Sequence, residues 1–103
     1  MNNQETPAPE TIAALLDSRR IEGEAVITGT LAHIDQRTNK AQNQYAVVTV
    51  DDGTGSLAVQ FFPKTWRLVR QHLVQGTRFT ISGRINHYDG VTTLFGSTAA
   101  TAQ

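Results

Sequence analysis

The sequence predicts an all-β domain in which five strands close into a barrel, with a helix between the third and fourth strands. Two observations lead to this prediction. Between residues 22 and 97, apolar residues recur at every second position in five separate segments, which is the period of a half-buried strand. Helical spacing of apolar residues occurs in two segments, 9–20 and 64–73. Closure into a barrel protects the sheet edges, and the second helix then covers one end of the core.

The chain is long enough for one core and too short for two. It has 103 residues, of which 39% are apolar and 17% charged, an ordinary globular composition. It contains no cysteine, which excludes disulfides, thiolate metal sites and a cysteine nucleophile. No apolar run approaches the length of a membrane span, and the acidic start MNNQETPAPE does not resemble a signal peptide. We therefore expect a cytoplasmic protein with no membrane contact and no cofactor.

The net charge of zero conceals an uneven distribution. Residues 1–35 carry six acids and two arginines, whereas residues 36–103 carry seven bases and three acids. The predicted barrel is thus mostly in the basic part of the chain. A split of this kind is typical of polyanion binding, although charges scattered over a solvated surface produce it as well.

The N-terminal 20 residues precede the predicted barrel. Residues 1–8 are polar and predict a flexible arm. Residues 9–20 predict a short amphipathic helix, with Pro9 in its first turn and an apolar stripe of Ile12, Leu15 and Leu16. Such a short helix is stable only when it packs against another surface.

The first three predicted strands cover residues 22–35, 45–51 and 56–62. A nine-residue polar loop, 36–44, joins the first two, and the turn DGTG joins the second and third. Alternation places the following residues in the barrel core: Ala25, Ile27, Gly29, Leu31, Ala46, Val48, Val50, Leu57, Val59 and Phe61.

After the third strand, Pro63 ends the ladder because it has no N–H to donate. KTWRLVRQHL, residues 64–73, predicts a helix that buries Trp66, Val69 and Leu73. The fourth strand, 77–86, places Phe79, Ile81, Gly83 and Ile85 inward. HYDG forms a hairpin tip, and VTTLFGS is the fifth strand. We assign residues 21–97 to the barrel and residues 98–103 to a flexible tail.

The predicted order is that of an OB fold: three strands, then a helix, then two further strands. We expect the five strands to form an antiparallel sheet. An SH3-like barrel is the main alternative, but it does not ordinarily place a ten-residue amphipathic helix at this position.

Several motifs resemble a known family. AVITGTLAHID, YAVVTVDDGTGSLAVQFFPKTW and TRFTISGRINHYDG are similar to the OB domain of the alpha subunit of bacterial DNA polymerase III. The resemblance covers residues 21–95 and includes D-x-T-G and F-P-x-x-W in register. DGTGSLAVQFF also resembles the wedge OB domain of the branched-fork helicase RecG. Both resemblances imply a domain that acts on DNA, either free-standing or part of a larger protein.

OB folds in general bind single strands across strands two and three, between the loops that join strands one–two and four–five. Cations there neutralise phosphates, and aromatic rings stack on bases. The candidate nucleic-acid-binding residues are Arg37, Lys40, Tyr45, Gln60, Phe62, Arg84, His87 and Tyr88.

Some of these residues have a second interpretation. Tyr45 is also a common strand former, and Phe62 beside Pro63 can instead pack beneath the helix. Trp66 is expected in the core. Arg67 and Arg70 form either a solvated helix face or a second path for phosphates.

No pattern indicates catalysis or a metal site. His33, His72 and His87 lack the spacing of zinc ligands. Asp51 and Asp52 are consecutive on a strand end, so they point to opposite sides and indicate a turn. The prediction is a non-catalytic module in replication or repair that binds single-stranded DNA weakly and without strong sequence preference. Its expected protein partners are replication or repair proteins. The alternatives are RNA binding, or a protein-interaction module in a replication, plasmid or phage assembly.

Overall fold

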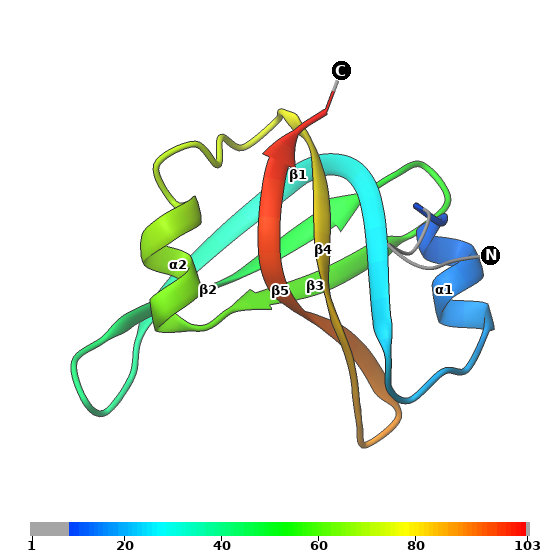
Figure 1. Cartoon of the computed structure of the whole chain (residues 1–103), viewed down its shortest axis with the longest axis horizontal. Coiled ribbons are helices and arrows are strands. Elements are labelled where there is room, and N and C mark those ends of the chain that lie inside the picture. Colours follow the sequence, from blue (N-terminus) through cyan, green and yellow to red (C-terminus); the bar gives the residue numbers. More distant parts are fainter. Residues whose placement is uncertain (1–8, 103) are drawn as a thin grey trace, which may run out of the picture.

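A computed structural model describes residues 9–102 as a closed five-stranded barrel with two short helices (Figure 1). The elements follow the predicted order: α1 (Ile12–Asp17), β1 (Glu24–Thr38), β2 (Gln44–Asp51), β3 (Ser56–Phe61), α2 (Pro63–Val69), β4 (Arg78–Tyr88) and β5 (Val91–Thr101). The sheet order is β1-β2-β3-β5-β4, and β4 pairs with β1 to close the ring. The predicted flexible arm, residues 1–8, lies outside the described residues.

One strand pair is parallel, which the prediction of an antiparallel sheet missed. β3 and β5 run in the same direction, with Val59 opposite Leu94, whereas the other four pairs are antiparallel. The reason is the strand number. Directions cannot alternate all the way round a ring of five strands, so at least one neighbouring pair must be parallel.

The core contains the residues that the alternation placed inward, and this prediction is confirmed. The inward-facing side chains of β1, β2, β3 and β4 are at most 3% exposed: Ala25, Ile27, Leu31, Ala46, Val48, Val50, Leu57, Val59, Phe61, Phe79, Ile81 and Ile85. Leu94 of β5 joins them. These side chains fill the barrel, so binding has to take place on its outer surface.

Gly96 lets β5 pass close to the core. A Cβ atom built on Gly96 would collide with the ring of Phe61, which is fully buried. The space that a side chain would take at Gly96 is therefore part of the Phe61 pocket.

Helix α1 is shorter than predicted. It begins at Ile12 after the N-cap Thr11, and Pro9 lies outside it in a parallel bridge with Val26 of β1. The segment around Pro9, before α1, is extended because its backbone pairs with β1. Ile12 and Leu15 are buried as expected, whereas Leu16 remains 41% exposed.

The turn between β2 and β3 caps α1 from 40 residues away. The N–H of Ile12 donates to Asp52 Oδ2 at 2.8 Å, and the N–H of Ala13 donates to Thr54 Oγ1 at 3.0 Å. Thr11 Oγ1 accepts from the N–H of Ala14 at 3.0 Å. Together the three side chains satisfy donors of the first helical turn that have no partner within the helix. The acidic turn thus fixes α1 to the barrel.

Helix α2 covers the opposite end of the core. Trp66 is 3% exposed, stacks against Phe61 at 6.4 Å between ring centroids, and donates its Nε1–H to Gln36 Oε1 at 3.1 Å. The helix starts at Pro63 and ends at Val69, four residues earlier than predicted. Beyond it, the N–H of His72 bonds the carbonyl of Val69, three residues back, and this tighter turn brings Leu73 into the core.

Two segments predicted as irregular are paired strand. β1 and β2 form a hairpin that extends to the pair Thr38–Gln44, which reduces the polar loop to residues 39–43. Residues 98–101, predicted as a tail, belong to β5 and pair with β4 as far as Phe79–Thr101. In both cases backbone hydrogen bonds extend the ladder where side chains are polar or small. None of the helices formed by residues 9–102 is long and apolar enough to cross a membrane.

Candidate nucleic-acid interface

Outward-facing residues of neighbouring strands lie in register across the barrel wall. Val47 of β2 is opposite Asp35 of β1 and Gln60 of β3. Gln60 is opposite Phe95 of β5, and Phe95 is opposite Arg84 of β4. Gln60 is therefore at the centre of an outer face that the β1–β2 loop and the β4–β5 tip flank. Both project downward in Figure 1, at lower left and lower right.

The Tyr45 hollow is a shallow depression of about 190 Å³ on this face. It is lined by Asn39, Tyr45, Gln60, Phe62 and Pro63. Tyr45 is held by the β1–β2 ladder, where it is opposite Arg37. The hollow offers two aromatic rings beside amide groups, which is a suitable surface for stacking a base.

Phe62 belongs to the outer face. Phe62 is 44% exposed. Its ring packs edge to face against the ring of Phe95, with centroids 4.8 Å apart and an interplanar angle of 72°. The alternative of packing beneath the helix is therefore wrong. As the N-cap of α2, Phe62 retains the extended backbone that precedes a proline, which keeps its side chain on the outside.

The Tyr88 hollow adjoins the first depression. It measures about 310 Å³ and is lined by Gln60, Asn86, Tyr88, Asp89, Val91 and Thr93. Gln60 is a wall of both hollows, so Tyr45, Phe62 and Tyr88 border one continuous surface. Tyr88 is 78% exposed at the end of the β4–β5 hairpin, which leaves its ring free for contact.

Arg37 is the cation at the edge of this surface. Its Nη2 and Nε atoms lie 2.7 and 2.9 Å from Asp35 Oδ2. The hydrogen bond to Asp35, followed by interaction with Tyr45, raises the pKa of Arg37 above its ordinary value. Arg37 therefore carries its positive charge opposite Tyr45 in the ladder, but Asp35 offsets part of its field.

Four candidate residues line neither hollow: Arg37, Lys40, His87 and Arg84. Arg37 is nevertheless opposite Tyr45 in the ladder, whereas the other three lie apart from this surface. Lys40 is exposed in the β1–β2 loop. His87 alternates with Asn86 and Tyr88 along β4, so it points to the other side of the hairpin. Arg84 borders a separate depression with Glu22, Gly23 and Glu24, and it is opposite Glu24 in the β1–β4 ladder. The structure thus brings together Arg37, Tyr45, Gln60, Phe62 and Tyr88 and separates the other three from them.

Sequence reasoning missed Phe95 and the amides of Asn39 and Asn86. Phe95 follows the buried Leu94 and precedes the buried Gly96, so the alternation in VTTLFGS already indicated an outward ring. Asn39 bends the β1–β2 loop, because its Oδ1 accepts from the N–H groups of Ala41 and Asn43. Within residues 9–102, no group of three or more His, Cys, Asp or Glu side chains is placed to hold a metal ion.

With this geometry established, comparison with known proteins decides the family. Residues 25–97 match the family described as the OB-fold nucleic acid binding domain. The chain belongs to this family. The match spans the whole outer face described above, so the resemblance to an OB fold is confirmed.

A protein relative agrees with the motif resemblance. The chain is 36% identical over 90 residues to the DNA polymerase III subunit alpha of Saccharopolyspora erythraea. The match covers 85% of this chain but only 8% of that polymerase subunit. The similarity is therefore to one small region of a much larger protein.

Two solved OB-fold structures illustrate what the same barrel does elsewhere. An OBody bound to hen egg-white lysozyme superposes with a TM-score of 0.71 at 18% identity, covering 96% of this chain and 98% of the OBody. The mitochondrial single-stranded DNA-binding protein Rim1 of S. cerevisiae superposes with a TM-score of 0.65 at 10% identity, covering 79% of this chain and 94% of Rim1. At these identities the likeness establishes the fold alone.

Proposed function

We propose that this chain is a non-catalytic OB-fold module that binds single-stranded DNA, without strong sequence preference, over the outer face of β2 and β3. The single observation that carries the proposal is the continuous surface bordered by Tyr45, Phe62 and Tyr88, with Gln60 in its centre. Aromatic faces stack on any base, and the few polar groups beside them do not form a base-reading pattern.

The expected affinity is weak. Arg37 is paired with Asp35, and the residues that line the two hollows include no lysine or arginine. Stacking therefore supplies a large share of the binding free energy, roughly 1–3 kcal/mol for each base on an aromatic ring. The relative among polymerase III alpha subunits supports a setting in DNA replication or repair, and hence in the cytoplasm.

Fluorescence anisotropy tests the proposal with a labelled oligo-dT of about 15 nucleotides, which covers the usual site size of one OB fold. Binding should be measurable at about 50 mM salt and weaken toward about 200 mM, by about 2.6-fold for each phosphate that the protein neutralises, because neutralisation releases counterions. Absence of binding at the lower salt concentration, by protein shown to be folded, would refute the proposal. Parallel titrations with oligo-rU and with duplex DNA distinguish RNA and double-strand binding.

Tyr45 provides a matched pair of variants. Tyr45→Ala removes a stacking ring and should weaken dT binding by about 5- to 150-fold, the equivalent of 1–3 kcal/mol. Tyr45→Phe retains the ring and the strand propensity, so its affinity should remain within about threefold of the wild type. Equal losses in both variants would mean that the hydroxyl, rather than stacking, carries the contact.

The second candidate function is binding of a protein partner. It is supported by the lysozyme-bound OBody and by exposed apolar side chains, including Leu68 at 72% and Ile21 at 65%. Mapping of amide chemical shifts on addition of dT or of a candidate partner separates the two functions. Changes at Tyr45, Gln60 and Tyr88 indicate the nucleic-acid face, whereas changes at Leu68 or Ile21 indicate a protein interface.

A further inference from the structure

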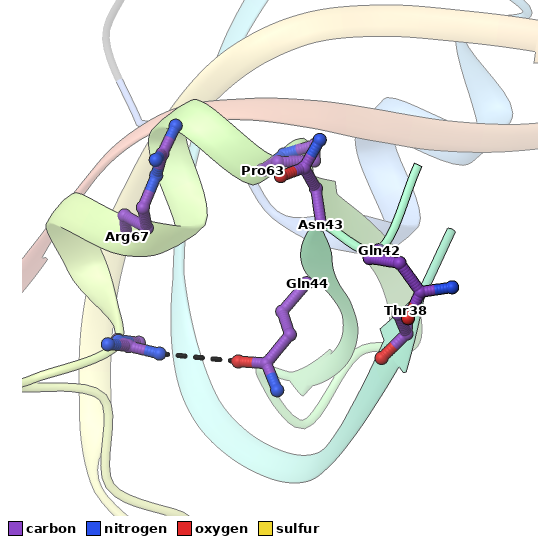
Figure 2. A pocket seen from close by; sticks show the side chains of 7 residues that line it. Thr38, Gln42, Asn43, Gln44, Pro63 and Arg67 are labelled. Atoms are coloured by element: carbon purple, nitrogen blue, oxygen red, sulfur yellow. Dashed lines mark hydrogen bonds between the residues drawn. The ribbon is translucent and has the colours of Figure 1, made fainter. Parts of the chain in front are cut away.

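A third hollow, the basic hollow, lies between the β1–β2 loop and α2 (Figure 2). It measures about 360 Å³ and is lined by Thr38, Gln42, Asn43, Gln44, Pro63, Arg67 and Arg70. No carboxylate belongs to this lining. Its polar groups are two guanidinium groups, three amides and a hydroxyl, which is a donor-rich set suited to an anion.

The two arginines project from one side of α2 because they are three residues apart. Arg70 Nη1 donates to Gln44 Oε1 at 3.4 Å, and Figure 2 shows this contact on one side of the hollow with Arg67 above it. The ion pairs Arg20–Glu10 and Arg37–Asp35 lie elsewhere and involve neither arginine of the basic hollow. Within residues 9–102, the charges of Arg67 and Arg70 are therefore not balanced by an acid in contact.

The basic hollow continues the surface already assigned to bases. Pro63 is a wall of both the basic hollow and the Tyr45 hollow, just as Gln60 is a wall of both the Tyr45 and Tyr88 hollows. The three depressions form a series from the β4–β5 tip across β3 to α2. A DNA strand with a base stacked on Tyr45 or Phe62 can reach Arg67 along the Tyr45 hollow and the basic hollow, whose linings contain no carboxylate.

We infer that the basic hollow binds a backbone phosphate of the same single strand whose bases stack on Tyr45 and Phe62. This inference rests on the proposed function and adds to it a phosphate anchor beyond the strand two–three face. Arginine suits this task because its planar fork bonds both non-bridging oxygens of a phosphodiester at once, and the neighbouring amides can donate to the remaining lone pairs of the same oxygens. The basic hollow also supplies cations in addition to Arg37, whose charge Asp35 partly offsets.

Salt dependence provides the test. The double variant Arg67→Gln/Arg70→Gln is compared with the wild type in dT titrations between about 50 and 200 mM salt. Loss of one phosphate contact should reduce the slope of log K against log salt by about 0.7 for a single strand. The ratio of the wild-type to the variant association constant should consequently be about 2.6-fold smaller at about 200 mM salt than at about 50 mM.

Two further variants separate charge from shape. Arg67→Lys/Arg70→Lys keeps both charges and should keep the wild-type slope, although it loses the bidentate contact. Arg19→Gln removes an exposed arginine beside α1, at the other end of the barrel, and should leave the slope unchanged. Thermal melting confirms that each variant folds.

The outcomes of the test are distinct. If the wild type binds and Tyr45→Ala weakens binding, but the glutamine variant keeps the wild-type slope, the phosphate anchor is wrong and the proposed function stands. The anchor is also wrong if Arg19→Gln lowers the slope as much as the glutamine variant does. If folded wild type does not bind dT at low salt, both proposals fall.

Discussion

The cap that the β2–β3 turn places on α1 leads to a prediction about stability. Asp52→Ala removes the carboxylate that accepts from the N–H of Ile12 at 2.8 Å. The same carboxylate accepts from the N–H and hydroxyl of Thr54 at 2.9 and 2.6 Å, so the turn that positions Thr54 beneath Ala13 loses its support as well.

The magnitude follows from burial. Ile12 is fully buried, and leaving its N–H without an acceptor costs about 1–3 kcal/mol. Loss of the exposed turn bonds adds about 0.5–1.5 kcal/mol. A complete release of α1 would expose Ile12 and Leu15, worth about 1.5–3 kcal/mol each, which sets the upper limit. We expect Asp52→Ala to lower the free energy of unfolding by about 2–3 kcal/mol.

Urea denaturation measures this loss, and hydrogen exchange at the amides of Ile12 and Ala13 locates it. The matched control is Asp51→Ala. Asp51 accepts from the N–H of Gly53 and from the hydroxyl of Ser56, and both bonds are exposed. Neither bond involves α1, in contrast to the bond that Asp52 accepts from Ile12. Its removal should cost less than about 1 kcal/mol. Equal losses in the two variants, or unchanged protection of the Ile12 amide in Asp52→Ala, would refute the remote cap.

Three other predictions concern the same fold. Partial burial opposes ionisation of Asp52, but hydrogen bonds from Thr54, Ile12 and Gly55 prevail and hold its pKa below the ordinary 3.8. The ionised Asp52 therefore contributes its full stabilisation above that value, and the contribution is lost as the pH falls through the lower pKa of the folded state. In Asp52→Asn, the free energy of unfolding should consequently decrease less on acidification than in the wild type. Gly96→Ala drives a methyl into the Phe61 ring and should cost about 1–3 kcal/mol in urea denaturation, whereas Gly55→Ala, whose Cβ would meet Ile12 Cγ2 at an ordinary 3.5 Å, should be nearly neutral. Deleting residues 98–103 removes four register pairs between β5 and β4. At roughly 0.5–1.5 kcal/mol per backbone bond, the deletion should lower the free energy of unfolding by about 2–6 kcal/mol. A loss below about 1 kcal/mol would mean that this segment behaves as a tail.

The inward face of each strand was predictable because it depends on local alternation. A residue such as Val48 or Ile81 faces the core as a consequence of its neighbours in sequence. The ends of elements were not predictable in this way. Residues 98–101 are strand because β4 is beside them, and α1 starts at Ile12 because Asp52, 40 residues away, accepts its N–H.

The candidate site was predicted in part for the same reason. Tyr45, Gln60 and Tyr88 were identified from outward positions in strands or at a hairpin end, and these positions are local properties. Arg84 was also an outward residue, but Glu22 and Glu24 lie beside it, and only the pairing of β1 with β4 in the closed barrel brings them there. Phe95 satisfied the local criterion and was overlooked.

The zero net charge of the chain does not argue against a polyanion ligand, because the charges are separated along β2. At one end of this strand are Asp51 and the next residue Asp52, which bonds α1, and at the other end Gln44 lies beside Arg70. The eight residues of β2 span roughly 23 Å, which is more than two Debye lengths at physiological salt. A phosphate in the basic hollow therefore experiences the arginines with little cancellation from the acidic turn. For the proposed DNA ligand, the same separation disfavours a path past α1 and favours a path toward the end of the barrel that α2 covers.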